Sequence, residues 1–499
     1  MTAPVLMVVG TASSVGKSVL VTALCRIFAQ DGVQVAPFKA QNMSNNAAVT
    51  ADGLEIGRAQ AEQAAAAGLE PEVAMNPVLL KPQGDRTSQV VLDGRPAGVL
   101  RSSEFIERKR DFWPHVERAL GSLRERYDLV VVEGAGSAAE PNLQASDIVN
   151  MRVARHAGAL TLLVGDIDRG GVFAHFLGTL DLLLPEDRPL VRGLVINRFR
   201  GDPSLLQPAI ELVEARGGVP VLGVIPWIDR LGVADEDAVA LERLPRAGTA
   251  APGEVEVAAI RLPRIANFDD FDPLLREPGV RVRWVESGRA LGMPDLILIP
   301  GTKATVADLG WLRAEGLDEA ISARVATGAH VLGICGGYQM LGERLLDRDG
   351  VEAAPGTEVN GLGLLPLTTE FTAVKATQRV GGTMCSVPGA WSAASGLDVR
   401  GYEIHMGRTM GSISPLLDLD GRPDGAVSAD GRVAGTYLHG LLHNDGVRHA
   451  LLAGLGRRSD RTSPSESGVA RQQAFDRLAS TVRTHLDVDA IRAMLRQKT

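Results

Sequence analysis

The chain has 499 residues, of which 45% are apolar, so it can bury large cores and is expected to form two or three domains. Its 52 Lys and Arg against 60 Asp and Glu give a net charge of −8 without a basic tail, which argues against nucleic acid as a partner. The N-terminus lacks a basic targeting region, and no apolar run reaches the roughly 18 residues that span a bilayer, so we predict a cytoplasmic protein with no membrane partner.

From residue 5 to about residue 225, apolar β-branched runs alternate with Gly-rich turns and helix-like segments. The clearest strands are predicted at residues 5–10, 127–134, 159–166 and 191–198. Such alternation is typical of an α/β fold with a doubly wound parallel sheet and helices on both faces. We therefore predict a first domain over residues 1–230.

The first predicted strand runs into the loop GTASSVGKS and then into a helical segment. Its backbone N–H groups and the helix N-terminus would cradle phosphates, with Gly10, Thr11 and Gly16 shaping the turn. Lys17 would reach the β- and γ-phosphates, and Ser18 would hold Mg²⁺. Five residues rather than four separate the two glycines, a spacing that resembles the loop of dethiobiotin synthetase and its relatives, which activate carboxylates with ATP. The predicted cofactors are thus ATP and Mg²⁺.

Three further residues complete this predicted nucleotide site. Glu133 ends a strand at the same crevice and is the predicted second metal ligand, although a surface glutamate is the plain alternative. Lys39 would add positive charge beside the transferred phosphoryl group, unless it is an ordinary solvated lysine. Asn197 resembles an adenine-reading asparagine of this superfamily, but it could equally be a turn residue.

Acidic residues also gather near the expected phosphate site. Asp147, Asp166 and Asp168 could orient the metal or assist ammonia attack on an acyl phosphate, and each could instead be a helix cap or turn acid. Asp147 is the favoured catalytic candidate because its segment matches the family named below.

The alternating pattern stops after residue 226. We predict a linker over residues 231–253, which are rich in Ala, Pro, Gly and acidic residues, and a second α/β domain over residues 254–453. The last segment, residues 454–499, begins Ser-rich and ends with a helical pattern that predicts a surface helix.

The second domain contains one cysteine in a special context. Cys335 lies between a short apolar strand and a helix, within the glycine-rich sequence GICGGYQ, which is the build of a nucleophile elbow. The other two cysteines, Cys25 and Cys385, are predicted to be small buried hydrophobes, and three scattered cysteines argue against a disulfide framework or a thiolate zinc site.

A nucleophilic thiol needs a histidine that usually comes from far along the sequence. His439 ends a predicted strand and is favoured over His405 and His443. Backbone N–H groups of Gly301, of Thr302 and of Gly336 are the predicted oxyanion hole.

The sequences GICGGYQMLG and TYLHG resemble the class I glutamine amidotransferase domain. The domain order, with KAQNMSNNA, NPVLLKPQGD, SDIVNMRVAR, DIDRGGVFA, IPGTKATVADL and YEIHMGRT, resembles the cobyric acid synthase family of cobalamin biosynthesis over nearly the full chain. Typical amidotransferases carry an acid two residues after the histidine, where this chain has Leu441. The departure predicts a Cys335–His439 dyad or an acid supplied from elsewhere.

This resemblance implies ATP-dependent amidation of adenosylcobyrinic acid a,c-diamide at its b, d, e and g carboxylates. The implied partners are the corrinoid, glutamine as ammonia donor and ATP, without a tightly bound prosthetic group; a homo-oligomer is compatible with the sequence. Because ammonia is protonated in water at neutral pH, we also hypothesise a sheltered passage between the two sites.

Three alternatives stay open from the sequence. The nearest is cobyrinic acid a,c-diamide synthase, expected to differ in QNMSNN and YEIHMGRT. The second is a partitioning or regulatory ATPase with a non-catalytic C-terminal half, although such proteins carry an early loop lysine where this chain has Thr11 and Ala12. The third is a degenerate amidotransferase domain that only binds, against which Cys335 and His439 count.

Overall fold

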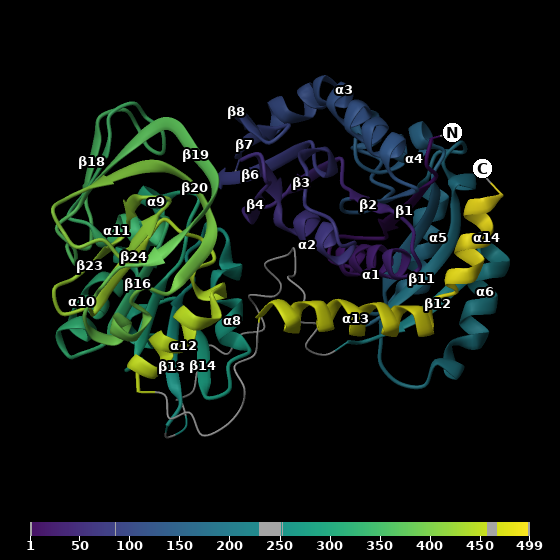
Figure 1. Cartoon of the computed structure of the whole chain (residues 1–499). Coiled ribbons are helices and arrows are strands. Elements are labelled where there is room, and N and C mark those ends of the chain that lie inside the picture. Colours follow the sequence, from purple (N-terminus) through teal and green to yellow (C-terminus); the bar gives the residue numbers. More distant parts are fainter. Residues whose placement is uncertain (1, 85, 229–250, 252, 457–466, 498–499) are drawn as a thin grey trace. The chain divides into compact units, whose positions relative to one another are not determined.

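The computed structural model describes residues 2–84, 86–228, 251, 253–456 and 467–497. The chain divides into two compact units (Figure 1). The N-terminal unit comprises Met1–Ser44, Glu55–Asp237 and Ala470–Thr499, and the C-terminal unit comprises Asn45–Leu54 and Ala238–Val469. The predicted linker lies almost wholly outside the described residues, as does the Ser-rich start of the last segment.

The N-terminal unit is built on a six-stranded sheet of order β12-β11-β10-β1-β9-β2, in which every neighbouring pair is parallel. The strands are β1 (Val5–Gly10), β2 (Val35–Phe38), β9 (Leu129–Glu133), β10 (Leu160–Asp166), β11 (Val191–Phe199) and β12 (Val221–Pro226). Every residue of β1, β9 and β10 is buried, because helices cover both faces of a parallel sheet. The predicted parallel sheet and its four clearest strands are confirmed.

A smaller sheet of order β3-β6-β7-β8 belongs to the same unit. Its strands are β3 (Gln41–Met43), β6 (Val78–Gly84), β7 (Thr87–Leu92) and β8 (Arg95–Arg101). The helices of the unit are α1 (Lys17–Gln30), α2 (Arg58–Ala66), α3 (Ser102–Arg126), α4 (Met151–Ala157), α5 (Val172–Leu182), α6 (Gln207–Gly217), α13 (Ser467–His485) and α14 (Val488–Arg496).

The last two helices correct the prediction of a surface helix at the end of the chain. Leu478, Val482 and Ile491 are buried in the core cluster that also contains residues of α1 and β1. Ion pairs add to the contact, with Arg26 Nη2 2.8 Å from Asp476 Oδ1, and Figure 1 shows α13 and α14 beside the elements of this unit. The apolar residues recur every three or four positions, which gives α13 and α14 a buried face.

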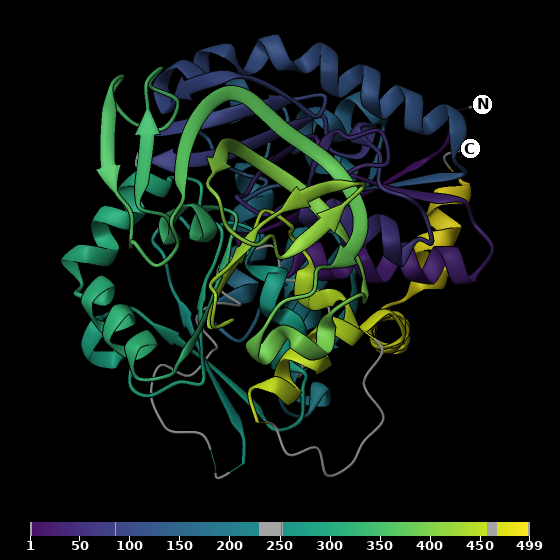
Figure 2. The same cartoon turned by 60° about the vertical axis from the view of Figure 1, so that its left-hand side comes forward.

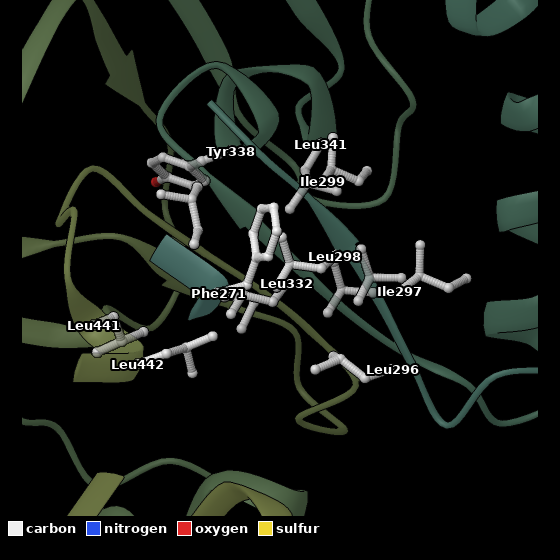
Figure 3. Packing of buried hydrophobic residues seen from close by; sticks show 14 of the residues in the cluster. Phe271, Leu296, Ile297, Leu298, Ile299, Leu332, Tyr338, Leu341, Leu441 and Leu442 are labelled. Atoms are coloured by element: carbon white, nitrogen blue, oxygen red, sulfur yellow. The ribbon is translucent and has the colours of Figure 1, made fainter. Parts of the chain in front are cut away.

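The C-terminal unit has its own sheet, of order β14-β13-β15-β16-β24-β23, parallel except for the last pair. The strands are β13 (Val255–Ile260), β14 (Val280–Val285), β15 (Leu296–Ile299), β16 (His330–Ile334), β23 (Ala426–Val427) and β24 (Val433–Thr436). Figure 3 shows Leu296, Ile297, Leu298 and Ile299 of β15 packed among the residues of this core. The second predicted α/β series is confirmed.

A second sheet of this unit has the order β18-β17-β19-β21-β22, with β20 also paired to β19. Its strands are β17 (Arg344–Asp347), β18 (Thr357–Asn360), β19 (Thr368–Met384), β20 (Asp398–Met410), β21 (Leu417–Leu419) and β22 (Arg422–Asp424). Figure 2 shows the long antiparallel pair of β19 and β20. The helices are α8 (Asp272–Leu275), α9 (Thr305–Ala314), α10 (Leu317–Ala326), α11 (Gly336–Leu341) and α12 (Asp445–Gly454).

Within the described ranges, no helix combines the length and the apolarity that crossing a bilayer requires.

Candidate active sites

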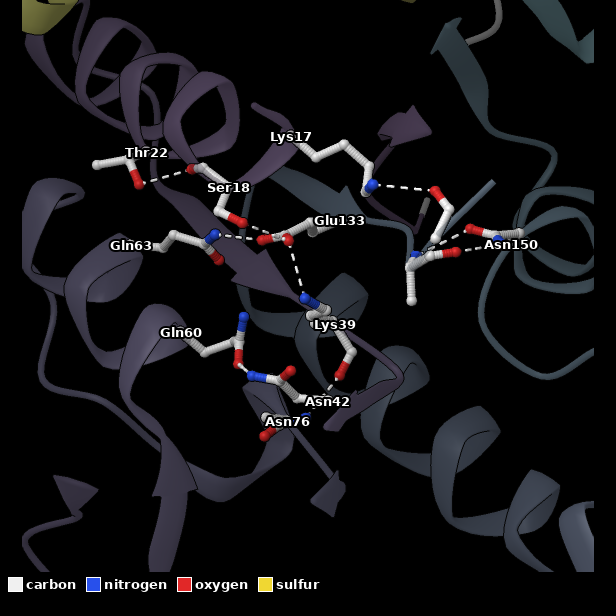
Figure 4. A network of polar contacts seen from close by, with 12 residues as sticks. Lys17, Ser18, Thr22, Lys39, Asn42, Gln60, Gln63, Asn76, Glu133 and Asn150 are labelled. Atoms are coloured by element: carbon white, nitrogen blue, oxygen red, sulfur yellow. Dashed lines mark hydrogen bonds and ion pairs between the residues drawn. The ribbon is translucent and has the colours of Figure 1, made fainter. Parts of the chain in front are cut away.

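The phosphate loop has the geometry that its sequence predicts. Strand β1 ends at Gly10, and α1 begins at Lys17 directly after Gly16, whose φ of 96° lies in the left-handed region that glycine adopts without strain. A Cβ at Gly16 would also lie 2.1 Å from Asn197 Nδ2, so only glycine fits. The Lys17 Nζ donates to the carbonyl oxygens of Ala12 at 3.0 Å and Gly136 at 2.9 Å, which holds its charge over the loop (Figure 4).

Glu133 is the centre of a buried polar network at the end of β9 (Figure 4). It is fully buried, and its Oε1 accepts hydrogen bonds from Ser18 Oγ at 2.8 Å and Lys39 Nζ at 2.9 Å. Gln63 Nε2 donates to Oε2 at 2.6 Å. A buried carboxylate is stable only when paired and hydrogen-bonded, and this one is both. The sequence did not indicate Gln63, which lies on α2.

The Ser18 hydroxyl and the Glu133 carboxylate are oxygen donors, the type that Mg²⁺ prefers, and one carboxylate plus nucleotide phosphates is a usual ligand set for this ion. The residues present therefore fit Mg²⁺. In the part of the chain that the structure describes, no group of three or more His, Cys, Asp or Glu residues could form an all-protein metal cage. A metal at this site would depend on the phosphates for its remaining ligands.

Two predicted residues make contacts that also serve the local fold. The Asn197 Nδ2 donates to Val15 O at 2.8 Å and so supports the phosphate loop from β11. Asp147 Oδ1 accepts from the backbone N–H groups of Val149 at 2.8 Å and Asn150 at 2.9 Å, at the start of α4. Asn197 as an adenine reader and Asp147 as a catalytic group stay predictions.

The two acids after β10 are both engaged by arginines. Asp166, which is buried, pairs with Arg198 at 2.9 Å, and Asp168 pairs with Arg200 at 3.2 Å. These ion pairs fit the alternative in which Asp166 and Asp168 stabilise the turn after β10.

A cavity of about 590 Å³ opens beside this network. Lys17, Ser18 and Glu133 line one part of it, and an apolar part comes from β6, β7 and β8. The wall also carries charged side chains: Lys39, Lys109, Asp147, Arg155, Asp187 and Arg198. Burial lowers the pKa of Lys109, and the nearby Asp147 carboxylate partly opposes that effect.

Cys335 forms a sharp turn between β16 and α11. Its φ of 52° is left-handed, which is strained for a residue with a side chain and is the mark of a nucleophile elbow. The surrounding glycines are required by space, since a Cβ at Gly337 would lie 2.0 Å from Ile299 O. The thiol is buried, with Sγ 3.6 Å from Ile404 O.

His439 follows β24 and is 1% exposed. A Cβ placed on Gly301 would lie 3.3 Å from His439 Cε1 and 3.7 Å from Cys335 Cβ, so the two side chains converge over this glycine. The Tyr402 ring stacks on the imidazole, with centroids 5.1 Å apart. The structure thus brings together the cysteine and histidine that the sequence paired.

The third member of this site is Asp270, which the sequence analysis missed. Its Oδ2 lies 2.8 Å from His439 Nδ1, and its Oδ1 accepts the Gly440 backbone N–H at 2.7 Å. Asp270 lies in the 3₁₀ turn Phe268–Phe271 that follows β13 and is 1% exposed. Of the two alternatives that the sequence left open, a dyad or an acid supplied from elsewhere in the chain, this geometry matches the second. The sequence does carry a signal for this residue: the acidic segment Phe268–Phe271 follows β13, which ends at the same edge of the sheet as β16 and β24.

The charges around His439 favour its protonated form. Burial alone would lower its pKa, but the Asp270 carboxylate and Cys335 outweigh burial and raise the pKa of His439 to about 10. His405, stacked on Tyr437, behaves oppositely, because burial lowers its pKa to about 4. His443 Nε2 donates to the Asp269 carbonyl oxygen at 2.8 Å.

Gly336 follows the nucleophile and packs against the loop after β15. A Cβ on Gly336 would lie 3.0 Å from the Thr302 backbone nitrogen, so the backbones meet beside the thiol. Gly301, Thr302 and Gly336 as oxyanion donors stay a prediction. Of the other cysteines, Cys25 is fully buried as predicted, whereas Cys385 is partly exposed.

Comparison with known proteins separates the same two halves. Residues 6–239 match the CobQ/CobB/MinD/ParA nucleotide binding domain, and residues 256–447 match the CobB/CobQ-like glutamine amidotransferase domain. A curated protein of Chloroflexus aurantiacus named cobyric acid synthase is 53% identical, covering 100% of both chains. Proteins of the same name from Sorangium cellulosum and Dehalococcoides mccartyi are 51% and 46% identical, covering 98% and 99% of both chains respectively.

Proposed function

The chain belongs to the cobyric acid synthase family, and from this membership we propose that it amidates the b, d, e and g carboxylates of adenosylcobyrinic acid a,c-diamide to give adenosylcobyric acid. Glutamine supplies the ammonia, and ATP activates each carboxylate. The observation that carries the proposal is the presence, in one chain related over its full length to these enzymes, of both a phosphate loop and a buried Cys–His–Asp site.

At the glutamine site, Cys335 Sγ attacks the side-chain amide carbon of glutamine. His439 takes the thiol proton and gives it to the departing ammonia, which leaves a glutamyl thioester on the cysteine. Asp270 fixes the imidazole through Nδ1 and stabilises the imidazolium that forms. Water then hydrolyses the thioester to glutamate. In this proposal, backbone N–H groups of Gly301, Thr302 and Gly336 would receive the oxyanion.

At the phosphate site, a substrate carboxylate oxygen attacks the γ-phosphorus of ATP and releases ADP, giving an acyl phosphate. Ammonia then attacks the acyl carbon, and phosphate leaves with the formation of the amide. Ser18 and Glu133 would hold Mg²⁺, which neutralises charge on the phosphates when bound. Lys17 and Lys39 supply further positive charge at the transferred group.

The cavity beside the phosphate loop suits a large ring that carries several carboxylates. Leu80, Val90 and Leu100 provide an apolar wall for the face of a macrocycle, while Lys109 and Arg155 provide positive charge for peripheral carboxylates. A cavity of about 590 Å³ is large enough to present one carboxylate at a time to the phosphate loop. The proposal that the corrinoid binds here rests on this chemistry.

The alternatives are less well supported. A partitioning ATPase would have no use for the Cys335–His439–Asp270 arrangement, and the full-length relatives are named as synthases. The a,c-diamide synthase is disfavoured because the full-length relatives carry the specific name cobyric acid synthase. Action in the cytoplasm, without nucleic acid or membrane partners and as a homo-oligomer, stays a prediction, as does a passage for ammonia between the sites.

The test measures glutamate, ADP and corrinoid mass with glutamine, ATP, Mg²⁺ and the a,c-diamide. Wild type should add up to four amides with one ADP for each. The Cys335→Ala variant should form no amide from glutamine but should keep amidation when ammonia replaces it.

Either of two results would contradict the proposal. If Cys335→Ala keeps full glutamine-dependent activity, the nucleophile is misassigned. If ATP is hydrolysed without a change in corrinoid mass, the substrate is wrong and the ATPase reading gains.

A further inference from the structure

Asn267 lies between the main chain of residue 47 and the catalytic histidine, and the mechanism above does not use it. Its Oδ1 accepts the Ala47 N–H at 2.9 Å, and its Nδ2 is 3.3 Å from His439 Nε2. The residue is 3% exposed, and its φ of 51° is left-handed, a conformation that is uncommon for a residue with a side chain. Such a conformation persists only where surrounding contacts enforce it, often at functional sites.

The direction of both hydrogen bonds follows from chemistry. A backbone N–H can only donate, so the Asn267 carbonyl oxygen must face Ala47 and its NH₂ group must face the histidine. The Nδ1 of His439 faces the Asp270 carboxylate and therefore carries a hydrogen. In the neutral imidazole, Nε2 is then left as the acceptor, and the Asn267 amide donates to it.

In this arrangement the Asn267 amide and the Cys335 thiol compete as donors for the same acceptor, His439 Nε2. His439 Nε2 has one lone pair, and the same lone pair must take the thiol proton of Cys335 for the cysteine to become a nucleophile. An amide held at Nε2 opposes the effect of Asp270 and Cys335, which favour the imidazolium, because two N–H groups would then point at one another. Withdrawing the amide leaves Nε2 to the thiol.

The donor that holds Asn267 comes from an unexpected part of the chain. Ala47 lies on β4 (Ala47–Val49), within the stretch 45–54 that belongs to the C-terminal unit, although the residues on either side of it in sequence belong to the N-terminal unit. Arg379 Nε donates to Val49 O at 2.7 Å and fixes the stretch on β19. Only seven residues separate Ala47 from Lys39, which contacts Glu133 at the phosphate site.

We propose that Asn267 is a positioning residue through which residues 45–54 restrain the glutaminase reaction of Cys335 and His439. Engagement of residues 39–44 by nucleotide and corrinoid shifts the stretch that follows them, loosens the Ala47 contact and releases Nε2. Glutamine is then hydrolysed when an acceptor is ready for its ammonia. The coupling rests on the proposed function, whereas the restraint itself concerns glutamine hydrolysis alone.

The main experiment compares glutamate release by wild type and Asn267→Ala, with glutamine alone and with ATP, Mg²⁺ and a,c-diamide corrinoid added. Loss of one neutral hydrogen bond should raise the rate with glutamine alone by about fivefold. The ratio of the stimulated rate to the unstimulated rate should fall toward one.

A matched pair at residue 47 tests the same contact from its other side. Ala47→Pro removes the N–H, and proline is tolerated at the first residue of a strand, whereas Ala47→Gly keeps the N–H. The proline variant should reproduce the loss of stimulation seen with Asn267→Ala. The glycine variant should keep the ratio of wild type.

The pH profile separates positioning from a purely structural role. The groups facing His439 are Asp270 and Cys335, with His405 close enough to interact electrostatically and the Tyr402 ring stacked on it. Removing the Asn267 donor makes the imidazolium easier to form. The alkaline limb of kcat/KM for glutamine should therefore move up by roughly half a pH unit.

Two results would overturn the restraint. One is an unchanged stimulation ratio in Asn267→Ala and Ala47→Pro. The other is loss of glutaminase activity under all conditions in variants that unfold at the temperature of wild type, which would mean that the amide assists catalysis. Absence of corrinoid amidation by wild type supplied with ammonia would instead contradict the proposed function, and the rate with glutamine alone would still decide the role of Asn267.

Discussion

The phosphate site and the glutamine site differ in how they stabilise a buried ionisable side chain. At the phosphate site, one buried carboxylate, Glu133, accepts hydrogen bonds from three side chains. At the glutamine site, His439 lies between Asp270 and Cys335, so that its charge can change during the reaction. The first is a fixed electrostatic frame for phosphate chemistry, and the second is a proton relay. Variants should therefore separate the two activities.

The largest effect is expected from Glu133→Ala. Removing this carboxylate takes away a predicted metal ligand and the partner of the buried Lys39 ammonium, so ATP-dependent amidation should fall by roughly 10³-fold or more with either glutamine or ammonia. Breaking a buried ion pair should also lower the free energy of unfolding by about 3–5 kcal/mol. ADP release and thermal unfolding measure the two effects.

The matched control for Glu133 is Glu125→Ala. Glu125 lies on α3, is exposed and does not line the cavity, so both properties should stay near wild type. Retention of amidation by Glu133→Ala would remove this carboxylate from the phosphate chemistry.

Asp270→Asn should affect only the glutamine site. The amide cannot stabilise the imidazolium and can hold the wrong tautomer, so kcat for glutamine hydrolysis should fall by roughly 10³- to 10⁴-fold, while ammonia-supported amidation persists. Asp272→Asn, two residues further along at the start of α8, is the control that should keep glutamine hydrolysis. A normal rate for Asp270→Asn would leave Cys335 and His439 as a dyad.

The contact between Asp270 and His439 makes both stability and glutaminase activity depend on pH. The pKa of His439 is raised above its unfolded value of about 6.5, so the stability it contributes is fully present below pH 6.5 and is lost as pH rises through about 10. The alkaline limb of glutaminase activity should accordingly lie well above pH 6.5 and should move down in Asp270→Asn. An alkaline limb near pH 6.5 in wild type would contradict the raised pKa.

The last helix offers a test of stability in one unit alone. Ile491→Ala removes a fully buried side chain of α14 from the core of the N-terminal unit and should cost about 2–5 kcal/mol. Arg26→Ala, which removes a partly exposed ion pair to α13, should cost less than about 1 kcal/mol. Denaturant unfolding compares the two. Equal, small costs would mean that α14 adds little to this core.

At the phosphate site, a smaller effect than that of Glu133→Ala is expected from Asn197→Ala. If Asn197 mainly supports the phosphate loop through Val15, KM should rise roughly tenfold for ATP and GTP alike, which corresponds to loss of one hydrogen bond. If Asn197 reads adenine, the preference for ATP over GTP should change instead. Kinetics with both nucleotides distinguish the two roles.

Much of the phosphate site was predictable because its parts are close in sequence or repeat a simple rule. Gly10, Gly16, Lys17 and Ser18 lie within nine residues, and Glu133 ends a parallel strand at the same sheet edge. Gln63 was missed because nothing in the helical sequence of α2 marks which of its glutamines faces the carboxylate. The burial of the last two helices was not predicted because a helical pattern does not show which core the apolar face of a helix packs against.

By itself, the sequence determined the alternation of strands and helices, the phosphate loop and the cysteine elbow. Each of these is a local pattern in which hydrophobic spacing and glycine geometry fix the backbone. Only the tertiary structure decided that Asp270, 169 residues from His439, completes the relay, and that Asn267 joins Ala47 to the same imidazole. These pairings depend on where separate strands end, and no local preference of the chain encodes that placement.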